Sequence, residues 1–154
     1  MINFVNIKAQ DKLSEKAGTA LTQGMWGFES GYNTEGDIQV SRVSNDTHAG
    51  YAVSKLGLVM NYPVDREGDE AAHDAIKIGD GIIFAKAADI VVEDDKLATN
   101  STTPAWASLS FGDNLVVNND GYLTVVGAAD APAGATPVAE FLKYENGIVF
   151  YRTV

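Results

Sequence analysis

Residues 138–154 read VAEFLKYENGIVFYRTV and carry the clearest signal of the fold class in the chain. Two runs rich in β-branched and aromatic residues, 138–144 and 148–154, lie on either side of Asn146-Gly147. Asn-Gly favours positive φ at both central positions of a two-residue turn, which makes it the strongest short-range signal for a β-hairpin. The stretch therefore predicts two antiparallel strands joined by a tight turn.

The same kind of patterning continues upstream, where short apolar runs alternate with Gly, Asn and Asp. The expected strands cover residues 21–29, 38–43, 51–60, 76–78, 81–84, 90–92, 115–117 and 122–126. Asp120-Gly121 is expected to turn the chain between the last two, and Gly57 to interrupt the strand at 51–60. A loop with one helical turn is expected within 63–75. The fold predicted is all-β, a mostly antiparallel barrel or sandwich with at most short helical turns.

A weak internal repeat relates residues 76–93 to residues 109–126. Ile78-Gly79-Asp80 in the first unit corresponds to Phe111-Gly112-Asp113 in the second. Glycine accepts positive φ and aspartate caps a turn, so each Gly-Asp pair is expected to bend the chain at the start of a strand. The repeat supports β structure more than it supports any activity.

The predicted organisation is an N-terminal arm, residues 1–20, followed by a single β-rich domain, residues 21–154. The polar arm buries little surface by itself, so it is either frayed or packed locally, or it lies on a partner. Two further polar or Ala/Pro-rich segments, 98–104 and 127–137, are expected to be surface loops that are free to contact a neighbour.

Composition excludes several classes of function. The formal net charge is −10, from 21 acidic and 11 basic residues, and this argues against a nucleic-acid partner, which requires positive charge. The chain has no cysteine, which excludes disulfides and thiolate metal sites and is compatible with synthesis in a reducing cytoplasm. No secretory signal and no apolar run of about 20 residues is apparent, so no membrane partner is expected.

Candidate chemistry is sparse. His48 and His73 are read as ordinary exposed histidines. The acidic groups Glu67, Asp69, Glu70 and Asp74, and Glu93, Asp94 and Asp95, fit no calcium-loop pattern and are read as solvated turns. No nucleophile-elbow or phosphate-binding motif occurs. The sequence therefore predicts a protein that is not an enzyme, with no catalytic residue, no cofactor and no metal.

The layout of the chain resembles that of the capsid decoration (cement) proteins of tailed bacteriophages. The resemblance is carried by the segment 17–26 leading into a first strand, by the Gly-Asp turn at 76–82, and by the end of the chain at 137–152. It implies a structural virion protein that binds the exterior of the phage head, on the outer capsid surface, and stabilises contacts between major capsid protein subunits. Self-association, for example as a trimer, is compatible with such a lattice.

Under this resemblance the residues expected to touch the capsid lie in the arm, the loops and the tryptophans. They are Ile2, Phe4, Val5, Ile7, Trp26, Thr102, Pro104, Trp106 and Pro132. The aromatic residues Trp26, Phe28, Tyr32, Tyr62 and Trp106 suit the core first, a protein interface second and a stacking platform for a sugar ring last. A tail, collar or fibre component of the virion, and a carbohydrate-binding module, therefore stay open as alternatives.

Overall fold

A computed structural model describes residues 2–4, 15–43, 55–60, 74–85, 90–100 and 102–154 of the chain. Thirteen strands carry the described part of the fold, and the helical elements described in full are one turn, α2 (Asp95–Ala98), and a short 3-10 helix, η3 (Trp106–Ser108). Most of the helical turn expected within 63–75 lies outside the described residues. The strands are β1 (Ile2–Phe4), β2 (Glu15–Ala17), β3 (Leu21–Thr22), β4 (Trp26–Tyr32), β5 (Ile38–Arg42), β6 (Leu56–Met60), β7 (Ala75–Ile76), β8 (Ile83–Ala85), β9 (Val91–Asp94), β10 (Asn114–Val117), β11 (Leu123–Val125), β12 (Ala139–Glu145) and β13 (Ile148–Thr153). The all-β prediction is confirmed.

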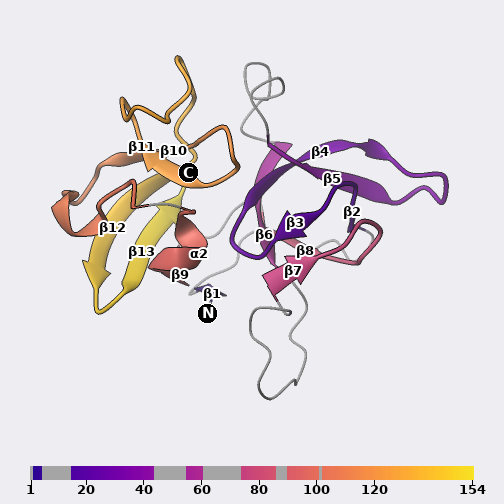
Figure 1. The fold of residues 1–154 in the computed structure, drawn as a ribbon, viewed down its shortest axis with the longest axis horizontal. Helices are drawn as coiled ribbons and strands as arrows, with labels where there is room; N and C mark the ends of the chain where they lie inside the picture. The colour runs from indigo at the N-terminus through magenta and orange to yellow at the C-terminus, as the bar shows by residue number, and fades with distance from the viewer. Residues whose placement is uncertain (1, 5–14, 44–54, 61–73, 86–89, 101) are drawn as a thin grey trace.

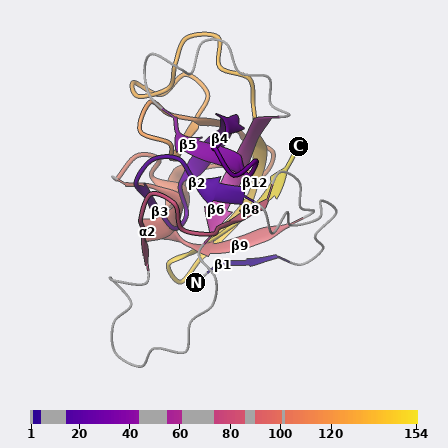
Figure 2. The same ribbon diagram turned by 90° about the vertical axis from the view of Figure 1, so that its right-hand side faces the viewer.

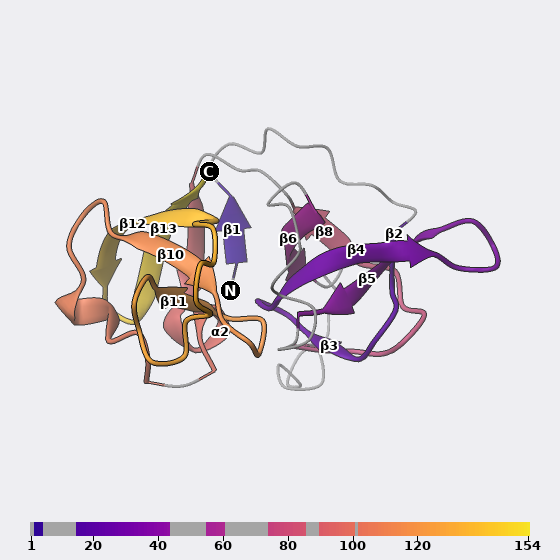
Figure 3. The ribbon, with the colours of Figure 1, turned by 90° about the horizontal axis from the view of Figure 1, so that it is seen from above.

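The strands form two main sheets. A six-stranded sheet has the order β1-β9-β13-β12-β10-β11, and a five-stranded sheet has the order β2-β5-β4-β6-β8, with β3 and β7 as a separate pair. β2 runs parallel to β5, and the other pairs of described strands run antiparallel. Figures 1 and 3 show β10–β13 on one side of the molecule and β2–β8 on the other.

The β12–β13 hairpin forms as the Asn-Gly pair predicts. Glu145 pairs with Ile148, so only two residues make the turn, and Asn146 and Gly147 have φ values of 52° and 78°. Both positive values match the twist that a two-residue hairpin requires. β13 then continues into the sheet and pairs with β9 on its other side.

The β4–β5 hairpin is built on an asparagine that the sequence reasoning passed over. Asn33 Oδ1 accepts hydrogen bonds from the backbone N–H groups of Glu35 (2.9 Å) and Asp37 (2.8 Å). Gly36, three residues after the asparagine, has a φ of +88°. Asparagine stabilises turns of this kind by bonding the backbone just ahead of it.

The β10–β11 hairpin uses the same loop. Asn118 Oδ1 accepts hydrogen bonds from the N–H groups of Asp120 and Tyr122, both at 2.9 Å, and Gly121 has a φ of +88°. The predicted turn at Asp120-Gly121 is therefore confirmed, but Asn118 organises it. The shared spacing Asn-x-x-Gly is the signal that would have found both loops.

Two predictions about strands are wrong, and a glycine explains each of them. The predicted strand 21–29 breaks after β3 because Gly24, with a φ of +89°, turns the chain before β4 begins. Conversely, Gly57 lies inside β6 and does not end the strand. A Cβ at this position would lie 2.7 Å from the Phe84 ring, so the absence of a side chain at Gly57 leaves room for that ring to pack against the strand. The run 76–78 also shortens, because only Ile76 belongs to β7.

The five-stranded sheet is buried on both faces at its centre, around β6. Consecutive residues of a strand point to opposite faces, and in β6 Leu58 joins one core cluster while Val59 joins the other, each fully buried. The first cluster continues into the six-stranded sheet, with residues such as Leu115 and Tyr151. A strand buried on both sides reads as a near-continuous apolar run, as LGLVM does at 56–60.

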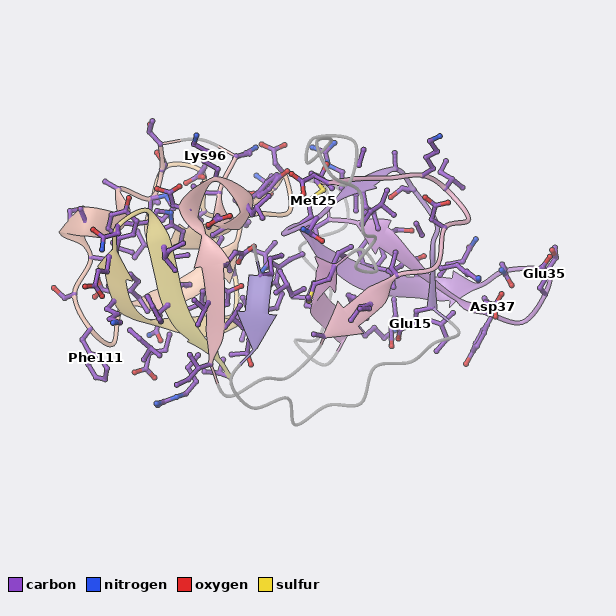
Figure 4. All side chains as sticks on the ribbon, turned by 90° about the horizontal axis from the view of Figure 1, so that it is seen from below. Glu15, Met25, Glu35, Asp37, Lys96 and Phe111 are labelled. Carbon is purple, nitrogen blue, oxygen red and sulfur yellow. The ribbon has the colours of Figure 1, made fainter. Side chains whose placement is uncertain are left out.

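The two groups of strands meet at the start of β4. Trp26 N–H donates a 2.6 Å hydrogen bond to the carbonyl of Gly121, in the β10–β11 loop. Met25, labelled in Figure 4, lies at this junction. Two pieces of the predicted arm, Ile2–Phe4 and Glu15–Ala17, pair with β9 and β5 respectively, and Figure 2 shows β1 alongside β9.

Candidate functional site

Several of the predicted capsid-contact residues lie in the interior. Ile2, Trp26 and Trp106 are 9%, 2% and 5% exposed and belong to the first core cluster. The Trp106 ring stacks on that of Phe141, with centroids 6.1 Å apart. These three side chains are therefore core residues, and they leave almost no surface free for a partner or a sugar. For the two tryptophans this favours the core interpretation over the interface and sugar interpretations.

The remaining predicted contact residues differ in their exposure. Thr102 is exposed and Pro132 is half-buried, whereas Pro104 is buried. Phe4 is described by its backbone alone, in β1, and Val5 and Ile7 lie outside the described residues. The contact role predicted for the arm therefore stays a prediction.

The loop at 127–137 is tied down by one aspartate. Asp130 Oδ1 accepts a hydrogen bond from the hydroxyl of Thr124 (2.7 Å), and Asp130 Oδ2 accepts one from Asn118 Nδ2 (3.0 Å). Thr124 and Asn118 are both buried. This loop is therefore held against the β10–β11 hairpin and presents a defined surface.

Replacing Asp130 by alanine is expected to cost about 2 kcal/mol of stability, because it leaves a buried hydroxyl and a buried amide without an acceptor. Chemical denaturation of D130A beside the parent chain measures the loss. Asp120 provides the control, because it is exposed and its side chain forms a surface ion pair with Arg42. The variant D120A should change stability by less than about 1 kcal/mol. Equal losses in the two variants would contradict the proposed role of Asp130 in holding this loop.

A shallow hollow of about 580 Å³ lies beside the loop at 98–104. Its lining combines the Tyr144 side chain with polar groups from α2 and the following loop, including Asp95, Lys96 and Asn100. Tyr144 donates a 2.8 Å hydrogen bond to Asp95 Oδ2, which raises the pKa of the Tyr144 hydroxyl. The hollow could accept a small polar ligand that offers one apolar face.

Five large apolar side chains are exposed in the described part of the chain. They are Tyr32, Ile78, Phe111, Val126 and Val154. Sequence reasoning counted Ile78 as part of a strand and named none of the five as a contact residue apart from the aromatic Tyr32. The signal was available in the repeat, because Ile78 and Phe111 occupy the same place before their Gly-Asp pairs.

The acidic groups do not assemble a metal site within the described residues, where no cluster of three His, Asp or Glu side chains is placed to hold an ion. Glu93 is turned into the interior, and Asp95 bonds Tyr144. His48 and His73, with Glu67, Asp69 and Glu70, lie outside the described residues.

Glu93 is a fully buried carboxyl group in β9. Its Oε2 accepts a 2.7 Å hydrogen bond from the hydroxyl of Tyr151, itself fully buried, and its Oε1 has no hydrogen-bond partner among the described residues. Burial raises the pKa of Glu93 from 4.5 to about 8, against the smaller lowering effect of the Tyr151 hydrogen bond. Burial also raises the pKa of Tyr151 well above 10. Burial therefore favours the neutral form of both side chains.

Comparison with known proteins yields no match to a family model, to a curated protein or to a solved structure. In the described residues, no helix has both the length and the apolar character that crossing a bilayer would take.

Proposed function

We propose that this chain is a non-catalytic structural protein of a tailed-phage virion, which binds the exterior of the head and stabilises contacts between major capsid protein subunits. The observation that carries the proposal is Phe111, a large aromatic side chain that is 74% exposed on a hydrogen-bonded turn. Aromatic side chains held outward in this way are typical anchors of protein interfaces.

The proposed mechanism is stabilisation by mass action. A protein that binds the assembled head much more tightly than separated subunits shifts the equilibrium towards the assembled state. The rigid sheets and the tethered loop at 127–137 lower the ordering cost of binding, because the surface is already organised before contact. The acidic net charge of −10 suits a basic partner surface and not a nucleic acid.

The test is a binding experiment with heads assembled from the major capsid protein of the virus that encodes this chain. The purified chain is expected to cosediment with assembled heads, to bind unassembled subunits far more weakly, and to raise the temperature at which heads release their contents. A reconstruction of decorated heads should place its density on the outer surface. Failure to bind heads, or density confined to the tail, collar or fibres, would overturn the proposal.

A carbohydrate-binding module is the second candidate, and the hollow beside Tyr144 favours it. The ring of Tyr144 could stack on a sugar, while Asp95, Lys96 and Asn100 could bond its hydroxyls. Glycan-array binding that is lost in Y144A would support this function. The parent chain is expected to bind no glycan if the head-binding proposal is correct.

A further inference from the structure

The turn between β7 and β8 is a compact, self-bonded unit. Lys77 N–H donates to Asp80 Oδ2 (2.9 Å), and Asp80 N–H donates to the carbonyl of Lys77 (3.0 Å). Gly79 has a φ of +87°, the left-handed value that glycine accepts without strain. Ile78 stands at the tip, between the two bonded ends.

The turn that leads into β10 repeats this geometry. Ser110 N–H donates to Asp113 Oδ2 (2.8 Å), Asp113 N–H donates to the carbonyl of Ser110 (3.0 Å), and Gly112 has a φ of +91°. Phe111 stands at the tip, in the position of Ile78. The two turns agree in every one of these features.

Each turn is also docked on a strand in the same way. Gly79 N–H donates to the carbonyl of Ala17 in β2 (2.8 Å), and Ala17 N–H donates to the carbonyl of Asp80 (2.9 Å). The corresponding two bonds join the second turn to Phe141 in β12, at 2.9 and 2.8 Å. Four hydrogen bonds therefore hold each tip residue at the same position relative to its sheet.

The two tips are exposed and far apart. Ile78 is 69% exposed and Phe111 is 74% exposed. Phe111 projects from the ribbon at the end of the molecule opposite to Glu35 and Asp37 (Figure 4), and the turn between β7 and β8 lies in the other group of strands (Figures 1 and 3). A single exposed apolar residue is ordinary, but two on duplicated rigid turns give the molecule two separate apolar contact points.

We propose that Ile78 and Phe111 are paired anchors, each of which enters an apolar pocket on a different copy of one partner subunit. The inference rests on the proposed function and deepens it, since the partner is then the repeating major capsid protein of the head. Equivalent turns suit equivalent pockets, and their location in separate sheet groups suits two neighbouring subunits. The chain would thus bridge neighbours, and both contacts would be lost if those subunits separated.

The experiment compares I78S, F111S and the double variant with the parent chain, using the assembled heads named above and, separately, unassembled capsid subunits. Removing either anchor converts a two-point attachment into a one-point attachment. Each single variant is expected to bind assembled heads roughly 10²–10⁴-fold more weakly, whereas the parent and the single variants should bind unassembled subunits within about tenfold of one another. The double variant should lose binding to both.

V126S is the matched control, because Val126 is exposed and apolar but lies outside the two turns. It should bind heads as the parent does, and thermal unfolding should show all variants folded, since exposed substitutions change stability little. If the parent binds heads but I78S and F111S bind them equally well, the anchor inference fails alone. If the parent does not bind heads, the proposed function fails and the inference fails with it.

Discussion

Replacing Gly24 by alanine is expected to destabilise the fold by about 4 kcal/mol. A Cβ at this position would lie 2.5 Å from the carbonyl oxygen of Leu97 and 2.8 Å from Glu93 Oε1, closer than atoms can approach. The φ of +89° adds a further cost of about 1–2 kcal/mol for a residue with a side chain, and overpacking adds about 1–3 kcal/mol. Denaturant titration of G24A measures the loss.

The control for this prediction is Gly36, whose φ of +88° is nearly the same but whose Cβ would meet nothing within 4 Å. G36A therefore carries the backbone cost without the steric conflict, and should lose about 1 kcal/mol. Equal losses of stability in G24A and G36A would show that the turn at Gly24 does not approach α2 as closely as described.

The second large effect is a dependence of stability on pH through Glu93. Below about pH 4.5 the carboxyl is protonated in both the folded and the unfolded chain, so its full favourable contribution is present. Between pH 4.5 and about 8 the unfolded chain ionises while the folded chain keeps its proton, and stability falls as pH rises. Above pH 8 the loss is complete and amounts to about 5 kcal/mol, at 1.36 kcal/mol per pH unit.

The variant E93Q isolates this effect, because glutamine keeps the shape and cannot ionise. The difference in unfolding free energy between the parent chain and E93Q is expected to change by several kcal/mol in favour of E93Q between pH 5 and pH 8. E35Q, the same substitution at an exposed position in the β4–β5 hairpin, serves as the matched control. A parent chain whose stability runs parallel to that of E93Q over this range would show that Glu93 is ionised in the folded protein.

The local turns were predictable because their chemistry lies within a few residues. Asn146, Gly147 and the glycines of the Gly-Asp pairs at 79–80 and 112–113 all have positive φ, and these turns form as expected. The Asn-x-x-Gly loops at Asn33 and Asn118 belong to the same class and could have been predicted from spacing alone. Propensity and turn chemistry act before tertiary contacts form, which is why these features survive in the fold.

The predictions fail where a residue distant in the sequence determines the local structure or the exposure of a side chain. At Gly24 the chain turns and passes close to Leu97 in α2, some 70 residues away in the sequence. No local sequence pattern predicts that contact. Trp26 and Trp106 offered bulk that suits either a core or an interface, and only the packing of two sheets around them distinguishes the two. The exposure of Phe111 is equally a tertiary property, although its place in the repeat pointed to it.

The burial of β6 on both faces restricts which substitutions the chain can tolerate. A change of volume at Leu58 disturbs one cluster, a change at Val59 disturbs the other, and Gly57 admits no side chain without displacing Phe84. The two clusters both pack against β6, so a packing defect in one cluster also disturbs the other. Amide protons in β6 should accordingly exchange with solvent only when the whole chain opens, and drift in sequence should be slowest there and fastest at the hairpin tips.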